Sequence, residues 1–319
     1  MKNDIIYYSI GALLYCPANK KDIADSIISE KFGTKFSLAL CLEDTINDNF
    51  VEEAEIILIS SLKQIHNNTQ EKSFYLPKIF IRVRNHEQIT RLTGLLGKAA
   101  DIVTGFIIPK FSTDNADDYI NAVIKANEIA DKPMYMMPIY ENSCIINPKN
   151  RTDILCRLKD SLSKVEDRVL NIRVGGNDLC NAFGFRRHND ESIHKIRPVS
   201  NIFADIITVY GMDYVVSGPV WEYYSGDGWD TGLRQEIRDD RLCGFTGKTV
   251  IHPNQIAIVN DEYKVSVKDY DDAKAILGWD KSFNSLVLGS QSGERMNEYK
   301  THGSWAVQTL FLAEAFGVK

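Results

Sequence analysis

Short apolar runs alternate along the chain with longer segments of helical periodicity. Each run has the length of a buried strand, and successive runs are spaced by roughly 25 to 45 residues, as βα units require. The predicted strands are 11–16, 37–42, 78–83, 105–108, 134–139, 169–174, 214–216 and 249–251. Strands that alternate with helices are typical of a parallel sheet. We therefore predict an α/β protein with a TIM (β/α)8 barrel, and an open doubly wound sheet is the alternative.

The chain beyond the eighth strand predicts an additional helical segment. Residues 266–279 have the pattern of a polar helix, 281–293 read as a looser connection, and 294–316 as a final amphipathic helix with Trp305 and Phe311 on its apolar face. We expect a barrel over residues 1–262 and a C-terminal extension over 263–319. Such an extension either caps the barrel or packs on another subunit.

Composition narrows the class of protein. Of the 319 residues 44 % are hydrophobic and 25 % charged, which is ordinary for a globular enzyme-sized core. A net charge of −6 argues against a protein devoted to nucleic acid or to an anionic membrane. The apolar N-terminal run is interrupted by Asp4, Ser9 and Gly11, so it makes a poor signal peptide. Six scattered cysteines without a CxxC pair predict reduced thiols in a cytoplasmic protein.

Acidic residues follow several of the predicted strands. Glu43 and Asp44 come directly after the second strand, Glu141 follows the fifth, and Asp178 lies just past the sixth. Each acid alone could be a loop residue or a helix cap. Because successive strand ends are neighbours in a parallel barrel, Glu141 and Asp178 could also converge on one hard cation. Magnesium takes one or two carboxylates and completes its shell with water and substrate oxygens.

Basic residues suggest contacts to an anion. Arg82 and Arg84 are two apart on the third strand, so both are expected on one side of it. A guanidinium suits a carboxylate or an enolate oxygen, although a structural ion pair is expected for one of the two. The cluster Arg186-Arg187-His188 either meets an anionic substrate or lies in a solvated loop.

The eighth strand presents His252 at its end, before Pro253, where α/β enzymes place chemistry. His252 is either catalytic or holds the turn.

Gly247-Lys248-Thr249 resembles the end of a phosphate loop, but Leu242 stands where that motif needs its first glycine. The aromatic segment 217–230 either covers a ligand or packs on the rim.

Seven segments together resemble the HpcH/HpaI aldolase and citrate lyase beta-subunit superfamily. The resemblance spans about Gly11 to Asn260 and is strongest to the C–C bond lyase group associated with tellurium-resistance gene clusters. The segments are LCLEDTI at 40–46, IRVRN at 81–85, GFIIPKF at 105–111, PIYEN at 138–142, VGGNDL at 174–179, DTGLRQE at 230–236 and GFTGKTVIHPNQIAIVN at 244–260.

The resemblance implies a TIM barrel that binds Mg²⁺ through Glu141 and Asp178, with Glu43 and Asp44 beside the metal. Arg82 would steady the carbonyl or enolate oxygen of the substrate, and homo-oligomers, trimers or hexamers, are common in the superfamily. The base that takes the substrate's hydroxyl proton could be His252, a metal-bound water, Glu43 or Asp44. The predicted substrate-binding residues are Lys20, Lys110, Arg173, Gly175 and Gly176.

Three functions follow from this reading. The first is a magnesium-dependent lyase that cleaves or forms a C–C bond next to a carbonyl in a small oxo acid. The second is an acyl-coenzyme A lyase or thioesterase, and the third is an inactive barrel that serves as a binding or assembly subunit.

Two departures from the superfamily's pattern bear on the choice among these functions. Lys20 stands near a turn that lacks the superfamily's usual Pro-Gly pair, and the long segment 217–230 occupies space that coenzyme A would need.

Overall fold

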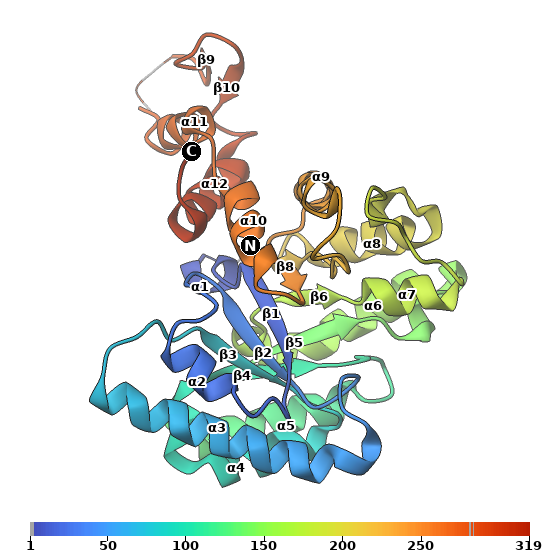
Figure 1. Cartoon of the computed structure of the whole chain (residues 1–319). Helices are drawn as coiled ribbons and strands as arrows, with labels where there is room; N and C mark the ends of the chain where they lie inside the picture. Colours follow the sequence, from blue (N-terminus) through green and yellow to red (C-terminus); the bar gives the residue numbers. More distant parts are fainter. Residues whose placement is uncertain (1–2, 281, 283) are drawn as a thin grey trace.

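The computed structural model describes residues 3–280, 282 and 284–319, and its centre is a sheet of eight parallel strands (Figure 1). All eight predicted strands are present in this sheet. They are β1 (Ala12–Pro17), β2 (Ser37–Cys41), β3 (Lys78–Arg82), β4 (Val103–Ile108), β5 (Tyr135–Tyr140), β6 (Ile172–Val174), β7 (Val216–Ser217) and β8 (Lys248–Val250). The strand order β7-β6-β5-β4-β3-β2-β1-β8 is that of a barrel opened between β7 and β8.

Single contacts close that seam. The amide of Thr246 donates to Val216 O at 2.8 Å, the amide of Gly218 donates to Gly247 O at 2.9 Å, and Gly218 bridges Lys248 in parallel register. The sheet is therefore a TIM barrel whose last two strands are short, and the open doubly wound alternative is wrong.

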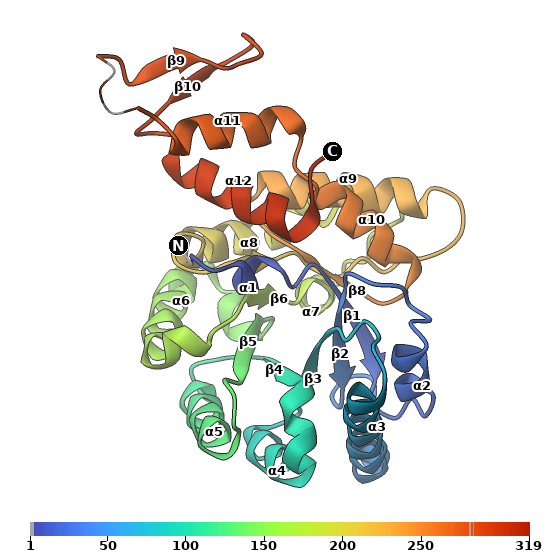
Figure 2. The same cartoon turned by 90° about the vertical axis from the view of Figure 1, so that its left-hand side faces the viewer.

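Helices cover the outside of the barrel, as strands buried on both faces require (Figure 2). They are α2 (Ile23–Ile28), α3 (Val51–Glu71), α4 (His86–Leu96), α5 (Ala116–Ile129), α6 (Pro148–Leu162), α7 (Gly176–Ala182), α8 (Arg197–Tyr210), α9 (Trp229–Leu242) and α10 (Asn254–Tyr263). Short 3-10 turns at 48–50, 97–102, 143–145, 163–168 and 193–195 join them. Helix α3 shows why the helices pack on the sheet. Its buried residues Ala54, Leu58, Leu62 and Ile65 recur at helical spacing and form an apolar face toward the sheet.

Inside the barrel, layers of side chains from alternate strand positions form a second core. It includes Leu13, Ala39, Phe80, Ile107 and Met137. Helix α1 (Ile5–Tyr8) lies at the end where the strands begin and packs Ile6 and Tyr7 against this core. The barrel interior is thus covered at that end.

The C-terminal extension consists of α11 (Val267–Leu277), a hairpin of β9 (Val287–Gly289) and β10 (Met296–Glu298), and α12 (Gly303–Phe316). One prediction is wrong here: residues 294–316 are not one helix, because 296–298 pair with β9 and the helix begins only at Gly303. Of the predicted connection 281–293, Lys281 and Phe283 lie outside the described residues.

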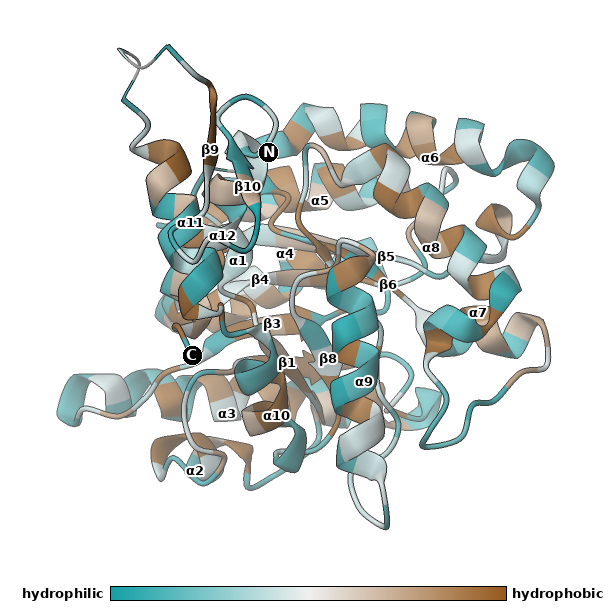
Figure 3. Cartoon of the chain, turned by 90° about the horizontal axis from the view of Figure 1, so that it is seen from above, coloured by the Kyte–Doolittle hydropathy of each residue, from teal (hydrophilic) through white to brown (hydrophobic). Residues whose placement is uncertain are grey.

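The extension packs on its own barrel at the end where the strands begin. Tyr8 of α1 stacks on Phe311 of α12 with ring centroids 4.9 Å apart, and Tyr263 of α10 stacks on Phe316 at 5.2 Å. The hairpin projects beyond this contact (Figure 2), and β9 is hydrophobic along its length (Figure 3). None of the described helices combines the length and the apolar character that crossing a bilayer would need.

Candidate active site

A cavity of about 260 Å³ opens at the carboxyl ends of the strands, where TIM barrels place their chemistry. Its lining combines charged residues with an apolar wall. The residues are Tyr15, Asp44, Thr45, Arg82, Ile139, Glu141, Arg173, Val174, Gly175, Gly176, Asn177, Asp178, Val220, Thr249 and Ile251. Six of the sequence candidates thus line the cavity beside Asp44: Arg82, Glu141, Arg173, Gly175, Gly176 and Asp178.

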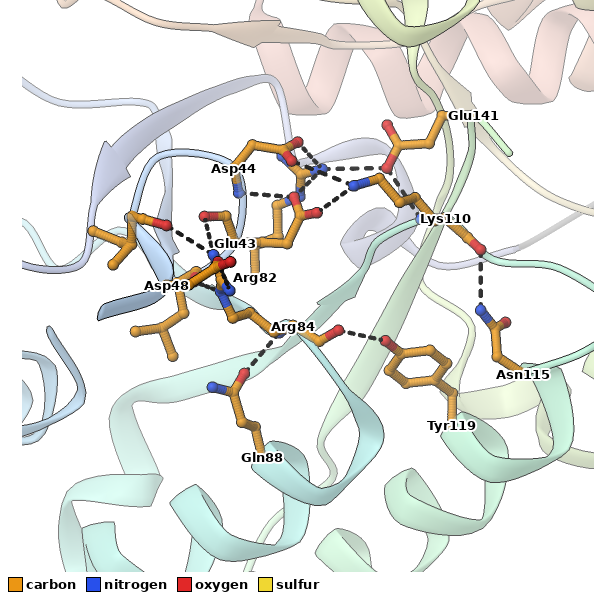
Figure 4. A network of polar contacts seen from close by, with 12 residues as sticks. Glu43, Asp44, Asp48, Arg82, Arg84, Gln88, Lys110, Asn115, Tyr119 and Glu141 are labelled. Carbon is orange, nitrogen blue, oxygen red and sulfur yellow. Dashed lines mark hydrogen bonds and ion pairs between the residues drawn. The ribbon is translucent and has the colours of Figure 1, made fainter. Parts of the chain in front are cut away.

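Arg82, the last residue of β3, is the centre of an acidic cluster at this mouth (Figure 4). Its Nη2 lies 2.7 Å from Glu43 Oε2, 2.9 Å from Asp44 Oδ2 and 3.2 Å from Glu141 Oε1. Burial alone would lower the pKa of the Arg82 guanidinium, but Tyr15, Glu141 and Glu43 raise it above its ordinary value. Arg82 therefore stays charged and fixes three carboxylates around one nitrogen.

Lys110 binds the same cluster from the end of β4. Its Nζ lies 2.7 Å from Glu43 Oε1 and 3.4 Å from Asp44 Oδ1, and its backbone amide donates to Glu141 Oε1 at 3.0 Å. Its φ of +49° is unusual for a residue with a side chain, and such backbone strain gathers at functional sites. Lys110 is not among the residues that line the cavity, and its side chain is about half exposed.

The two members of the Glu43-Asp44 pair differ in their surroundings. Glu43 is buried, and burial raises the pKa of its carboxyl. Burial also acts on Asp44, but hydrogen bonding to Glu43 and the charges of Arg82 and Lys110 outweigh it and lower the pKa of Asp44. Asp44 is the member that lines the cavity. It is therefore a charged carboxylate at neutral pH that faces the open space.

Glu141 and Asp178 are brought together, although 37 residues separate them in the sequence. Both line the cavity, Glu141 just after β5 and Asp178 in the first turn of α7. Burial of Glu141 raises the pKa of its carboxyl to about 7, with the nearby charge of Asp178 adding to the rise and Arg82 opposing it. Gly175 permits this approach, since a Cβ there would lie 2.2 Å from Glu141 Cβ and 2.3 Å from its Oε2.

This pair fits a hard divalent cation. Glu141 Oε1 accepts from Arg82 and Lys110, which leaves Oε2 for another partner, and within the described part of the chain Asp178 forms no ion pair. Two like charges facing one cavity repel each other, and a cation between them would remove that cost. No group of three or more His, Cys, Asp or Glu among the described residues could hold a metal, so water or substrate oxygens would complete the shell, as Mg²⁺ prefers.

Other sequence candidates lie elsewhere. Arg84 lies beyond the end of β3 and does not join Arg82; its guanidinium donates to Leu42 O at 2.8 Å and Ile46 O at 2.7 Å (Figure 4). It holds the β2–α3 loop, as expected for one of the two arginines. Lys20 is outside the cavity lining and forms a partly exposed ion pair with Asp22 at 3.3 Å.

His252 is also absent from the cavity lining. Its Nδ1 accepts from the amide of Asn254 at 3.2 Å, and its ring stacks on Tyr224 with centroids 4.7 Å apart. These contacts hold the turn into α10. Gln255 strengthens the same turn, because its side chain donates to Trp221 O at 3.0 Å and Tyr223 O at 2.9 Å.

The aromatic segment 217–230 is thereby fastened to the rim. Trp221 is fully buried, and only Val220 of this segment lines the cavity. The basic cluster beside it divides: Arg186 is exposed and lies 3.7 Å from Glu222, whereas Arg187 is buried against Glu236 at 3.4 Å. Neither arginine lines the cavity.

Sequence reasoning missed Tyr15 and Thr249, which line the cavity from β1 and β8. Tyr15 lies two positions after the inward-facing Leu13, so strict strand alternation would have placed it inside the barrel. Thr249 had no such signal, because a threonine in a short apolar strand is equally common on either face.

Comparison with known proteins agrees with this geometry. The family model for the C–C bond lyase of the TIM-barrel fold matches residues 4–318. The mitochondrial citramalyl-CoA lyases of Rattus norvegicus and Homo sapiens are 23 % and 22 % identical over 290 residues, covering 89 % of this chain and 80 % and 79 % of theirs.

Solved structures share the fold at lower identity. A citrate lyase from Burkholderia xenovorans superposes with a TM-score of 0.69 at 14 % identity, over 97 % of this chain and 93 % of its own. The protein CitE from Mycobacterium tuberculosis, in complex with magnesium, acetoacetate and coenzyme A, gives 0.61 at 16 % identity, over 97 % and 99 %. The citrate lyase beta subunit of the same organism, complexed with oxaloacetate and magnesium, gives 0.53 at 18 % identity, over 82 % and 99 %.

Proposed function

Because the chain belongs to the family of C–C bond lyases of the TIM-barrel fold, we propose that it is a magnesium-dependent lyase acting on a small oxo acid. The reaction cleaves or forms a C–C bond next to a carbonyl. The observation that carries this proposal is the convergence of Glu141 and Asp178 on one cavity beside the fixed guanidinium of Arg82.

Glu141 and Asp178 would hold the cation. When bound, a divalent cation supplies positive charge that stabilises a carbonyl oxygen as it gains negative charge. The residues of the chain supply the rest. Arg82 aims a charged donor into the cavity from a position held by three carboxylates, so it needs little rearrangement as charge develops. Lys110 neutralises part of the acidic cluster and holds Glu43 in place.

The proton acceptor we propose is Asp44. Of the protein side chains considered from the sequence, it alone lines the cavity, while Glu43 is buried beneath it and His252 holds a turn. Its ionised carboxylate can accept a proton from a substrate hydroxyl in the cavity. We expect Asp44→Asn to lower kcat about 100-fold or more, and His252→Asn to leave kcat near that of the wild type.

A direct test is exchange of the methyl protons of pyruvate with D₂O, followed by NMR. Exchange requires removal of a proton next to a carbonyl, and it does not depend on knowing the full substrate. We expect exchange with Mg²⁺, and its loss with EDTA and in Glu141→Gln, Asp178→Asn and Arg82→Met. Arg186→Met is the control, because Arg186 is exposed and does not line the cavity. Exchange that is equal with and without divalent metal would overturn the proposal.

An acyl-coenzyme A lyase is the second candidate, since citramalyl-CoA lyases match 89 % of this chain. The cavity of about 260 Å³ holds a small acid, so the coenzyme would have to lie outside it, past the segment 217–230. Saturable binding of coenzyme A at micromolar concentration, measured by calorimetry, would favour this candidate over a free oxo acid.

We further propose a cytoplasmic homo-oligomer, a trimer or hexamer, with the extension 263–319 at a subunit interface. Support comes from six free cysteines and from Leu286, Leu288 and Met296, which are each more than two-fifths exposed on the hairpin. Light scattering of Leu288→Glu against wild type tests the interface: a lower mass supports it, and an unchanged mass refutes it. Tellurium resistance stays a prediction.

A further inference from the structure

Arg173, which the sequence predicts to bind substrate, lies at the cavity, and what it binds there has not been assigned. It is the middle residue of β6, in register with Ile139 of β5, and is only 2 % exposed. Its Nη2 donates to Thr249 Oγ1 at 2.6 Å. Its Nη1 is buried and has no hydrogen-bond partner. One arm of the guanidinium is thus fixed by Thr249, and the other is buried on the side of Tyr15 without a hydrogen-bond partner.

The other buried arginines show what Arg173 lacks. Arg82 contacts three carboxylates, Arg151 lies 2.7 Å from Asp205, and Arg187 lies 3.4 Å from Glu236. Among the described residues Arg173 has no carboxylate partner. A buried charge without a counter-ion is costly, and proteins retain few of them unless something else supplies the opposite charge. An anion that enters the cavity would supply it.

Neighbouring residues complete an anion site. Tyr15 lies between the two arginines: it interacts with the charge of Arg173, and its ring centroid is 5.9 Å from Arg82 Cζ. Tyr15 and Thr249 both line the cavity, and the Thr249 hydroxyl accepts the hydrogen bond from Arg173. The wall between Arg173 and the acidic cluster includes Ile139 and Val174, which offer no polar competition. The cavity therefore has an acidic pole at Glu141 and Asp178 and a cationic pole at Arg173.

We infer that Arg173, Tyr15 and Thr249 bind a second carboxylate of the substrate, so that the enzyme selects dicarboxylic oxo acids over monocarboxylic ones. This inference rests on the proposed function for the carbonyl end of the substrate. A guanidinium with a free arm and two hydroxyl groups can surround one carboxylate with donors. The small volume favours an acid whose two ends reach both poles at once.

Calorimetric titration of the full chain with pyruvate and with freshly prepared oxaloacetate, both in Mg²⁺, tests the inference. The two acids differ by one carboxylate. We expect the wild type to bind oxaloacetate tighter than pyruvate by about tenfold or more, the usual effect of a charged hydrogen bond. Arg173→Met should abolish this preference and leave pyruvate binding unchanged. Arg186→Met, which replaces an exposed arginine outside the cavity, should keep the preference.

Thermal unfolding shows whether the Arg173→Met protein is folded, so that a loss of the preference is not caused by misfolding. Without ligand, Arg173→Met should unfold no earlier than wild type, because it removes a buried charge and strands no acid. If Met is not tolerated, Arg173→Lys should fold and retain part of the preference. An Arg173→Met protein that folds and still prefers oxaloacetate would overturn the inference.

The two proposals fail separately. Equal affinity for both acids, with binding that still requires Mg²⁺, would refute the role of Arg173 and leave the lyase proposal standing. A preference that depends on Arg173 but ignores Mg²⁺ would support the second carboxylate site and refute the metal-dependent function.

Discussion

Two networks of acids and cations lie in this barrel, and their composition is similar. One surrounds Arg82 at the mouth, with Glu43, Asp44, Lys110 and Glu141. The other lies at the seam between β7 and β8, where Lys248 Nζ contacts Glu236 Oε1 at 2.9 Å and Asp240 Oδ2 at 2.7 Å.

The seam network is closed to water and balanced. His194 Nε2 lies 2.7 Å from Asp240 Oδ1, the Ile193 amide donates to Glu236 Oε2 at 2.8 Å, and Arg187 donates to Val220 O. Lys248, Glu236 and Asp240 are all fully buried, so every charge meets its partner inside the protein. Burial acts to raise the pKa of Asp240, but Lys248 and His194 outweigh it and lower that pKa.

The mouth network is open and unbalanced. Counting Asp178, it holds four carboxylates and two cations, and the pKa of Glu141 is raised to about 7. The residue types do not separate a structural network from a functional one. What separates them is whether oxygen atoms facing a cavity are left without a cation.

The largest loss of stability should come from a substitution in the seam network. Lys248→Met leaves Glu236 and Asp240 as buried acids without their lysine, which costs about 3–5 kcal/mol of stability. Urea unfolding at neutral pH measures this loss. The matched lysine of the mouth is the control: Lys110→Met should cost at most about 1 kcal/mol, because its side chain is half exposed. Equal losses for the two variants would contradict the comparison.

A second test uses the pH dependence of Glu141. Its folded pKa of about 7 is raised above the ordinary 4.5, so the folded state holds a proton that the unfolded state releases. Stability should therefore fall as pH rises from about 4.5 to 7, by roughly 3 kcal/mol in total. Glu141→Gln keeps a neutral side chain and should lack this fall, as seen in urea midpoints at pH 5 and pH 8. A parallel fall in the variant would refute the assignment.

A third test changes the backbone position that brings the acids together. In Gly175→Ala the new Cβ would overlap Glu141, so we expect a cost of about 1–3 kcal/mol from overpacking and the loss of Mg²⁺ binding. Gly94→Ala in α4 is the control. No atom lies within 4 Å of its added Cβ, and replacing a helical glycine should stabilise by about 0.5–1 kcal/mol. Unimpaired Mg²⁺ binding by Gly175→Ala would argue against the Glu141 site.

The smallest effect is expected at an exposed ion pair. Lys20 pairs with Asp22 outside the cavity, and both side chains are more than a third exposed. Lys20→Met should leave the urea midpoint close to that of the wild type, because an exposed ion pair contributes little to stability. It should also leave oxo-acid binding unchanged in calorimetry. Weaker binding would show that Lys20 reaches the substrate.

Much of the fold follows from the apolar pattern, because β2 is buried along its whole length and its neighbours β1 and β3 are buried at most positions, so they read as apolar runs. The convergence of Glu141 and Asp178 also follows, since neighbouring strand ends must meet in a parallel barrel. The seam network does not follow. Nothing in the sequence around Lys248 indicates that its partners lie on α9. Lys248 was therefore noticed only as part of a segment that resembles the end of a phosphate loop.

The remaining differences have similar causes. The hairpin of β9 and β10 was read as connection and helix, because three residues per strand are too few to show alternation. Tyr15 becomes informative only when the neighbouring strands are in place. Arg173 was predicted to bind substrate, but its lack of a carboxylate partner among the described residues appears only in the structure.

Calorimetric titration with Mg²⁺ tests the central claim most directly. The proteins are the wild type, Glu141→Gln, Asp178→Asn and the control Arg186→Met, each with and without oxaloacetate. We predict that Mg²⁺ binds to the wild type and to Arg186→Met, that oxaloacetate tightens this binding, and that either carboxylate substitution abolishes it. Failure of the wild type to bind a divalent cation, or equal binding by all four proteins, would contradict it.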